Sequence, residues 1–218
     1  GLSRVLVVCP AALRTKWQDE MTSRFEEDFQ EMDARALQGF LKAYDRYGQA
    51  QHLKGIVSLE LLRRKEIIKQ LSASAVHFDL VIIDEAHHCR NQKTNQHKVS
   101  SILGENADAM LLLTATPIMM GSKDLFHLLR VLSPDEFTKV QVFEEQINAN
   151  RHINQAVSAL DAGRYEQALQ ELSLFGLTSV GMHHLDDLRY KGFVRILKKK
   201  YLDQDQAVDA RRRLLELN

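Results

Sequence analysis

The sequence contains 218 residues, of which 44% are hydrophobic and 27% charged, and its 29 basic residues balance 29 acidic ones. This composition is typical of a globular protein with roughly one to one and a half domains, and its zero formal charge lacks the basic excess common in nucleic-acid-binding proteins. The two cysteines exclude a disulfide scaffold and a four-cysteine zinc site, and no apolar run approaches the roughly 20 residues that span a bilayer. We therefore expect a soluble cytoplasmic protein.

The first two-thirds of the sequence alternates short apolar runs with helical patterns, which is typical of α/β proteins with a mainly parallel sheet. Strands are predicted at residues 5–8, 55–58, 78–83 and 110–113, and helices from Pro10 onward, at 61–71 and at 122–132. In the first helix, Leu13, Trp17 and Met21 are spaced four apart and share one face. The run at 78–83 is apolar enough for an interior strand that is covered on both faces.

The pattern changes after Phe137, because no convincing strand remains and the rest of the chain is predicted to be helical. We therefore expect two parts, an α/β domain over residues 1–138 and a helical accessory region over residues 139–218. The neutral total charge conceals a local change of sign. Residues 140–188 hold two basic and seven acidic side chains, whereas residues 189–218 hold nine basic and four acidic ones.

The strongest chemical signal is the sequence Asp84-Glu85-Ala86-His87, which directly follows the apolar run at 78–83. Ligands of open parallel sheets bind outside the carboxyl ends of the strands, so both carboxylates are expected where a ligand binds. Because side chains alternate along an extended chain, the two acids can take separate tasks. Asp84 is the candidate for holding Mg²⁺ through its water shell, and Glu85 for polarising a water that attacks a γ-phosphate.

A zinc site is the alternative for this segment, because His87, His88 and Cys89 are consecutive and His97 follows. Adjacent residues rarely ligate one ion together, and the sequence contains neither the H-E-x-x-H spacing nor a C-x-x-C pair. The pattern therefore does not favour metal ligation by these histidines.

A second signal is the sequence Thr114-Ala115-Thr116-Pro117, which follows the next predicted strand. Small hydroxyl side chains at a strand end can hydrogen-bond toward His87 and so report the state of a nucleotide pocket to another surface. Thr114, Ala115 and Thr116 are therefore candidate coupling residues.

A third signal is the junction between the first predicted strand and the helix that Pro10 opens. The unpaired backbone N–H groups of a helix N-terminus can bind phosphates. Trp17, farther along this helix, is better explained by packing in the core or in a groove than by stacking on a base.

These segments together resemble successive motifs of superfamily 2 helicases, and more narrowly those of Snf-type ATPases. The matching segments are Cys9-Pro10-x-x-Leu13 with Trp17, Val57 to Arg63, Asp84 to His88 with Arg90-Asn91, Leu113 to Ile118, and Leu125 to Phe137. They occur in the family's order. Met119, Met120 and Gly121 replace residues common in eukaryotic members, which favours the bacterial branch related to the RNA-polymerase-recycling ATPase.

The resemblance implies a RecA-like lobe of a P-loop NTPase that uses ATP and Mg²⁺. By resemblance, Asp84 is the Walker B acid and Mg²⁺ ligand, Glu85 activates the water, and His87 couples hydrolysis to Thr114 and Thr116. The surroundings of Pro10, Ser58 and Arg90 are implied to face the nucleic-acid backbone, where contacts position a duplex without distinguishing its sequence.

The family's phosphate loop is the main departure, because no glycine in the sequence is followed by lysine. The family places that loop upstream of the Cys-Pro motif, so we expect that the sequence starts inside the first RecA-like lobe. No second strand-rich lobe with arginine fingers follows. The fragment alone is therefore expected to be inactive as an ATPase.

The basic run near the C-terminus includes Lys198 and Lys199, and it is either a phosphate-binding surface or a solvated helix face. The resemblance implies an ATP-dependent translocase on double-stranded DNA that is completed by a second RecA-like lobe. It also implies a nuclease or other proteins as partners and a location at the bacterial nucleoid. Two alternatives remain: a degenerate scaffold lobe without ATP turnover, and the motor subunit of a restriction or defence system.

Overall fold

The computed structural model describes residues 2–48, 51–115, 121–198 and 208–212, and within them the chain divides into two compact units. The first unit spans residues 1–138 and the second spans 139–218. The predicted α/β fold class is confirmed, since the first unit contains a parallel sheet between helices. No helix in the described ranges is long and apolar enough to cross a membrane.

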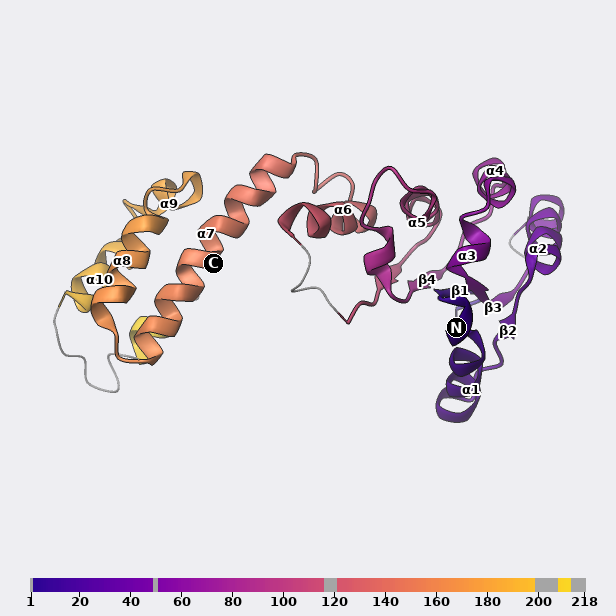
Figure 1. Ribbon diagram of the computed structural model, residues 1–218, viewed down its shortest axis with the longest axis horizontal. Coiled ribbons are helices and arrows are strands. Elements are labelled where there is room, and N and C mark those ends of the chain that lie inside the picture. Colours follow the sequence, from indigo (N-terminus) through magenta and orange to yellow (C-terminus); the bar gives the residue numbers. More distant parts are fainter. Residues whose placement is uncertain (1, 49–50, 116–120, 199–207, 213–218) are drawn as a thin grey trace. The chain divides into compact units, whose positions relative to one another are not determined.

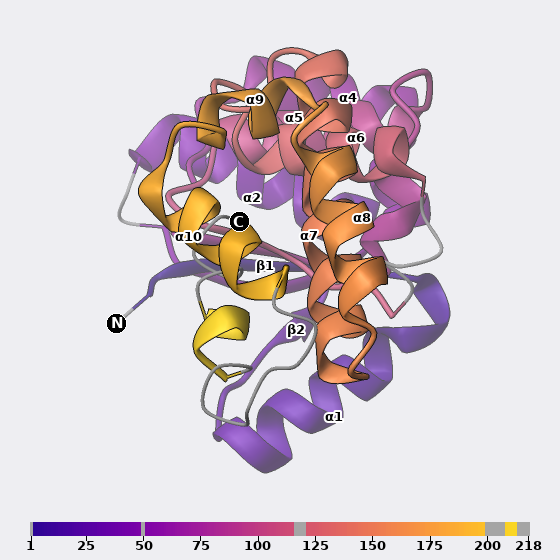
Figure 2. The same cartoon turned by 90° about the vertical axis from the view of Figure 1, so that its left-hand side faces the viewer.

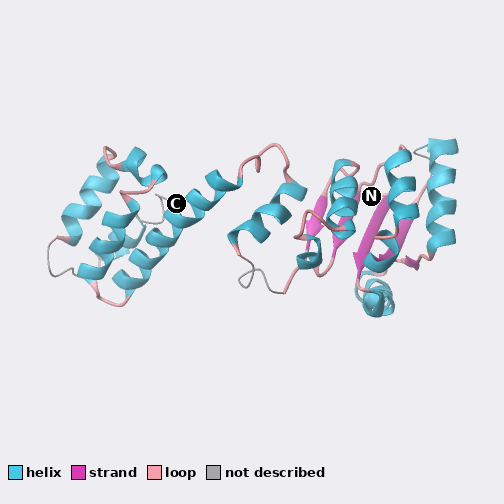
Figure 3. Cartoon of the chain, turned by 45° about the horizontal axis from the view of Figure 1, so that its top comes forward, coloured by secondary structure: helices cyan, strands magenta, loops and turns pink. Residues whose placement is uncertain are grey.

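The sheet of the first unit has five strands in the order β2-β3-β1-β4-β5 (Figures 1 and 3). Every neighbouring pair is parallel. The strands are β1 (Arg4–Cys9), β2 (Gln30–Glu31), β3 (Leu53–Ser58), β4 (Leu80–Ile83) and β5 (Met110–Leu112). All five strands therefore present their carboxyl ends at one edge of the sheet, which is where ligands of such sheets bind.

The side chains of β1 and β4 alternate between two apolar layers. Leu6 and Ile83 belong to the larger layer, which the helices α2 (Ala34–Tyr47), α4 (Lys65–Ala73) and α5 (Asn95–Glu105) complete. Val7 and Ile82 belong to the smaller layer, against which α1 (Arg14–Phe25) packs. Figure 1 shows α1 on one side of the sheet and α4 and α5 on the other. The interior strand predicted at 78–83 is confirmed over the shorter range Leu80–Ile83 as β4, which pairs with both β1 and β5.

The helix expected to begin at Pro10 starts later than predicted. Pro10 precedes a 3-10 turn, η1 (Ala11–Leu13), and its carbonyl accepts a hydrogen bond from the Leu13 N–H at 2.9 Å. The α-helical bonding pattern begins only at Arg14. The apolar face is nevertheless as predicted, because Leu13, Trp17 and Met21 all pack against the smaller layer.

The single helix predicted at 61–71 is wrong, because the chain forms two helices there. A short helix, α3 (Leu59–Leu62), is separated from α4 by Arg63 and Arg64. The ψ of 134° at Arg64 is that of an extended residue. The break changes the helix direction, so that the leucines of α3 and the isoleucines of α4 all reach the core. The charged residues of the segment stay exposed at the break.

Three elements were not among the predicted ones: β2, α2 and α5. Both helices begin with capping signals that the sequence contains. The carboxylate of Asp33 accepts a hydrogen bond from the Ala36 N–H at 2.8 Å, and the Thr94 hydroxyl accepts one from the His97 N–H at 3.3 Å. The helix α6 (Ser122–Leu132) has the predicted bounds.

The second unit is helical throughout its described part, as predicted. It contains α7 (Val140–Asp161), α8 (Tyr165–Phe175), α9 (Ser179–His184), α10 (Leu188–Leu197) and a helical stretch at 208–212. Figures 1 and 2 show α7 and α8 side by side. Its separate core includes Ile153 of α7 and Phe175 of α8, and the Tyr190 hydroxyl of α10 donates to the Leu172 carbonyl at 3.0 Å.

Candidate functional site

The candidate site lies at the carboxyl end of β4. The Asp84 N–H donates to the Val8 carbonyl at 2.8 Å, which extends the pairing between β4 and β1 by one residue. The chain then leaves the sheet through η3 (Ala86–Cys89). The Ala86 N–H donates to the Leu113 carbonyl at 2.9 Å and so joins this loop to the segment that follows β5. The structure therefore brings Thr114 and Ala115 beside the acidic loop.

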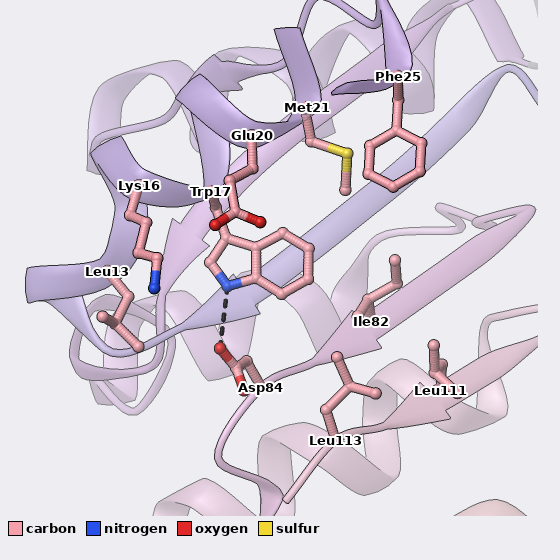
Figure 4. A pocket seen from close by; sticks show the side chains of 10 residues that line it. All are labelled: Leu13, Lys16, Trp17, Glu20, Met21, Phe25, Ile82, Asp84, Leu111 and Leu113. Atoms are coloured by element: carbon pink, nitrogen blue, oxygen red, sulfur yellow. Dashed lines mark hydrogen bonds between the residues drawn. The ribbon is translucent and has the colours of Figure 1, made fainter. Parts of the chain in front are cut away.

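Both oxygens of the Asp84 carboxylate accept hydrogen bonds. Oδ1 accepts the N–H of Glu85 at 2.8 Å, and Oδ2 accepts the indole N–H of Trp17 at 2.9 Å (Figure 4). Each carboxylate oxygen has a second lone pair, so capacity remains for further donors such as the waters around a cation. The carboxylate of Asp84 is thus held in one orientation by two different elements.

Glu85 has a left-handed backbone, with φ +50° and ψ +44°. This conformation costs an L-residue on the order of 1–2 kcal/mol, and such outliers cluster at functional sites. It turns the chain out of the strand directly after Asp84. The Glu85 side chain remains about one-third exposed, with Oε2 3.1 Å from Nδ1 of His87.

We predict that Glu85→Gly gives a more stable protein than Glu85→Ala, by about 1 kcal/mol, because glycine adopts positive φ without the steric cost. Both variants lose the carboxylate, so the comparison isolates the backbone. Denaturant unfolding of the two proteins checks it. Equal stability of the two variants would show that the backbone at this position is not strained.

His87 follows this turn, and its ring is partly buried. Its Nδ1 is near Glu85 Oε2 but off the hydrogen-bonding direction, so this buried nitrogen has no hydrogen-bond partner among the described residues. The ring packs against His88, with centroids 4.1 Å apart. A buried ring nitrogen without a partner favours binding of a hydroxyl or a water when one comes within reach.

The zinc alternative gains no support from the geometry. No cluster of three or more His, Cys, Asp or Glu residues within the described ranges has the arrangement of a metal site. Nδ1 of His97 is bonded to the Cys89 carbonyl at 2.8 Å. Burial raises the pKa of the Cys89 thiol to about 11, and burial together with the nearby Asp84 carboxylate raises the pKa of Cys9 to about 12. Both thiols are therefore protonated near neutral pH.

The residues expected to face a nucleic-acid backbone follow three strand ends at one edge of the sheet. Cys9 pairs with Ser58 across β1 and β3, which places Pro10 next to Ser58. Ser58 is buried, and its hydroxyl caps α3 by accepting the Leu61 N–H at 3.1 Å. The Ala11 N–H donates to the Glu60 carboxylate at 3.1 Å and links these two segments.

Arg90 is half-exposed and already has partners within the chain. Its guanidinium donates to the His87 carbonyl at 2.9 Å and pairs with the Asp124 carboxylate at 3.1 Å. A phosphate bound at Arg90 would compete with Asp124, which lies in the first turn of α6.

Two of the predicted site residues, Thr116 and Lys199, lie outside the described residues. Lys198 belongs to the second unit, where it is exposed directly after α10. It lines a shallow cavity of that unit together with residues of α8 and α10.

Trp17 is the functional candidate that sequence reasoning placed in packing alone. It does pack, because its ring lines a largely apolar cavity of about 510 Å³ between α1 and the ends of β4 and β5 (Figure 4). Its N–H, however, donates to the carboxylate of Asp84, which lies 67 residues farther along the sequence. No local pattern in the sequence indicates this contact.

Comparison with known proteins identifies the family. The sequence profile of the SNF2-related domain matches residues 2–185, which includes the acidic loop, the segment after β5, and α7 to α9. The chain belongs to the SNF2-related family. The resemblance to Snf-type superfamily 2 ATPases is thereby confirmed, and with it the RecA-like fold of the first unit.

A curated relative supports the same branch of the SNF2 family. The RNA polymerase-associated protein RapA of Vibrio atlanticus (strain LGP32) is 33% identical over 166 residues, which are 73% of this chain and 17% of that protein. The chain thus spans about one-sixth of the relative's length. Among solved structures, the Sulfolobus solfataricus SWI2/SNF2 ATPase core in complex with dsDNA matches with 21% identity and a TM-score of 0.47, covering 66% of this chain and 28% of that one.

Proposed function

We propose that this chain is part of an ATP-dependent motor that moves along double-stranded DNA or remodels proteins bound to it. The observation that carries the proposal is the pair of adjacent carboxylates at the carboxyl end of β4. Asp84 is held there by the Trp17 N–H, and Glu85 has a left-handed backbone. Membership of the SNF2-related family supports a motor rather than a degenerate scaffold. The phosphate loop and the second lobe that ATP turnover requires would come from outside these residues.

The donor chemistry of the site fits Mg²⁺. This ion usually binds through one or two carboxylates, substrate phosphates and retained waters rather than in an all-protein cage. Asp84 offers such a carboxylate at the strand end, and the described residues provide no competing cage of three or more ligands. When bound, Mg²⁺ would neutralise charge on the transferred phosphoryl group.

The side chains around the acid have separate proposed tasks. Asp84 holds the cation, and Glu85 accepts hydrogen bonds from a water and turns it toward the γ-phosphate. The unpartnered Nδ1 of His87 and the bond between Ala86 and Leu113 support a coupling role for the segment Thr114-Ala115-Thr116. Movement of that segment would then shift the loop that carries Glu85, because the bond between Ala86 and Leu113 joins the two.

DNA is the proposed track, and its backbone would meet the sheet edge at Pro10, Ser58 and Arg90. Because Ser58 is buried as a helix cap, we propose that it acts by shaping the backbone of this edge rather than by contacting phosphate itself. The name of the bacterial relative, an RNA polymerase-associated protein, supports a protein partner of that kind. We propose a place at the nucleoid only as a consequence of the DNA track. DNA-stimulated ATP hydrolysis by the intact motor is the deciding measurement.

The basic run after α10 is proposed as a further phosphate contact, and a charge reversal tests it. We expect Lys198→Glu to weaken duplex binding by the 218-residue chain and to lower the slope of log affinity against log salt by about 1, because one fewer counterion is released. Lys69→Glu, at an exposed lysine of α4, is the control with the same charge change. Equal slopes in both variants would assign Lys198 to a solvated helix face.

A further inference from the structure

Trp17 connects two parts of the first unit that are far apart in sequence. It lies on α1, one helical turn after the 3-10 turn at residues 11–13, and its ring edge points toward the end of β4 (Figure 4). The 2.9 Å bond from Nε1 to Asp84 Oδ2 crosses from that helix to the acidic loop. Among the described residues it is the only hydrogen bond from a side chain to Asp84, since Oδ1 accepts a backbone N–H.

The environment of the ring makes this bond well defined. The partly buried indole packs against the smaller apolar layer of the sheet. It shares the lining of its cavity with apolar side chains from α1 and from the ends of β4 and β5, namely Leu13, Met21, Ile82 and Leu113. Because one side of the ring packs against the smaller layer, the fold directs its N–H toward Asp84. A carboxylate with one oxygen fixed by a rigid side chain and the other by backbone cannot rotate without breaking a bond. Its remaining lone pairs therefore keep their direction.

We propose that Trp17 is a positioning residue that orients the Asp84 carboxylate toward Mg²⁺. This inference rests on the proposed function, in which Asp84 holds the cation. The physical reason is that hydrogen bonds to a metal-binding carboxylate lower the entropic cost of fixing it, and their removal typically weakens metal affinity 10–100-fold. Trp17 touches no reacting group, because it acts only through Asp84.

The first test is the Mg²⁺ dependence of ATP turnover by the intact motor carrying Trp17→Phe. Phenylalanine keeps an apolar ring in the cavity and lacks the N–H. We expect the Mg²⁺ concentration at half-maximal rate to rise about 10-fold, with kcat at saturating Mg²⁺ within about threefold of the parent. Met21→Leu changes the same cavity without touching Asp84 and is the matched control. It should leave the Mg²⁺ dependence unchanged.

A merely structural role gives a different pattern. If Trp17 only fills the cavity, Trp17→Phe and Met21→Leu lower stability or kcat without moving the Mg²⁺ midpoint, and that result overturns the proposal. The proposed function fails separately, if the parent motor shows no DNA-stimulated turnover.

The second test needs no activity, because Trp17 is the only tryptophan in the 218 residues. A ¹⁵N-labelled chain therefore shows one indole N–H signal by NMR. We expect this signal to move upfield in Asp84→Asn, where the anionic acceptor is lost, and to shift saturably when Mg²⁺ alone is added to the parent but not to Asp84→Asn. An indole signal that is identical in the parent and Asp84→Asn, or that does not respond to Mg²⁺, overturns the proposal even where the motor hydrolyses ATP.

Discussion

Glu85→Gln is expected to reduce DNA-stimulated ATP turnover by the intact motor at least ~100-fold, consistent with the loss of a catalytic group that handles a proton. Glutamine has nearly the same shape and can still hydrogen-bond a water, but its amide is a far weaker acceptor than a carboxylate. The backbone strain at φ +50° is the same for both residues, so the substitution isolates the acid. Steady-state turnover with and without duplex DNA measures the effect.

The loss should appear in kcat, because in the proposed arrangement Glu85 contacts the attacking water rather than the bound nucleotide. Glu66→Gln makes the same chemical change at an exposed position in the first turn of α4 and is the control. It should keep the parent rate. Equal turnover in the parent and in Glu85→Gln would remove the role assigned to Glu85 and would favour the scaffold alternative.

The position of the acids was predictable from the sequence for a simple reason. A buried parallel strand ends at a sheet edge where ligands bind, and the run before Asp84 is long and apolar enough to identify that strand without tertiary information. The same reasoning places Thr114 beside the acids, because β4 and β5 are neighbours whose carboxyl ends meet. The family resemblance then supplied the chemistry that strand patterns alone leave open.

The contacts that orient these groups were not predictable in this way. The bond from Trp17 to Asp84 depends on how far α1 tilts over the sheet, and the pair formed by Arg90 and Asp124 depends on where α6 packs. Periodicity determines which face of a helix is apolar, but it does not determine the partner of a polar atom at the edge of that face. The left-handed backbone of Glu85 likewise follows from tertiary bonding, because glutamate has no intrinsic preference for positive φ.

β4 is flanked by two aspartates, one in the proposed functional site and one in a stabilising ion pair. Asp84, at its carboxyl end, belongs to the proposed site. Asp79, at its amino end, lies in a mostly buried ion pair with Arg4 and also accepts the backbone N–H groups of Ser3 and Arg4. Arg4 donates in addition to the His77 carbonyl at 2.7 Å. This cluster joins the start of β1 to the start of β4 and has no counterpart among the sequence predictions.

Asp79→Asn is expected to lower the free energy of unfolding of the first unit by about 3 kcal/mol at neutral pH, because it removes the carboxylate that pairs with the mostly buried guanidinium of Arg4. Trp17 fluorescence during denaturant unfolding reports this unit, since it contains the only tryptophan. Asp108→Asn is the control, because its pair with His77 is largely exposed and should contribute less than about 1 kcal/mol. Equal losses of unfolding free energy in the two variants would show that burial of the ion pair does not determine its contribution to stability.

The pH dependence gives a second, independent check on Asp79. The backbone N–H of Ser3, supported by Arg4, holds the pKa of the Asp79 carboxyl below its usual value. The unfolded chain, with an aspartate pKa of about 3.9, therefore takes up this proton at a higher pH than the folded chain. The contribution of ionised Asp79 to the free energy of unfolding is fully present above the unfolded pKa, and it is lost as the pH falls through the lower pKa of the folded chain. The difference in free energy of unfolding between the parent and Asp79→Asn should consequently shrink in acid. If that difference instead stays constant from neutral pH to about pH 3, these contacts do not hold Asp79 ionised.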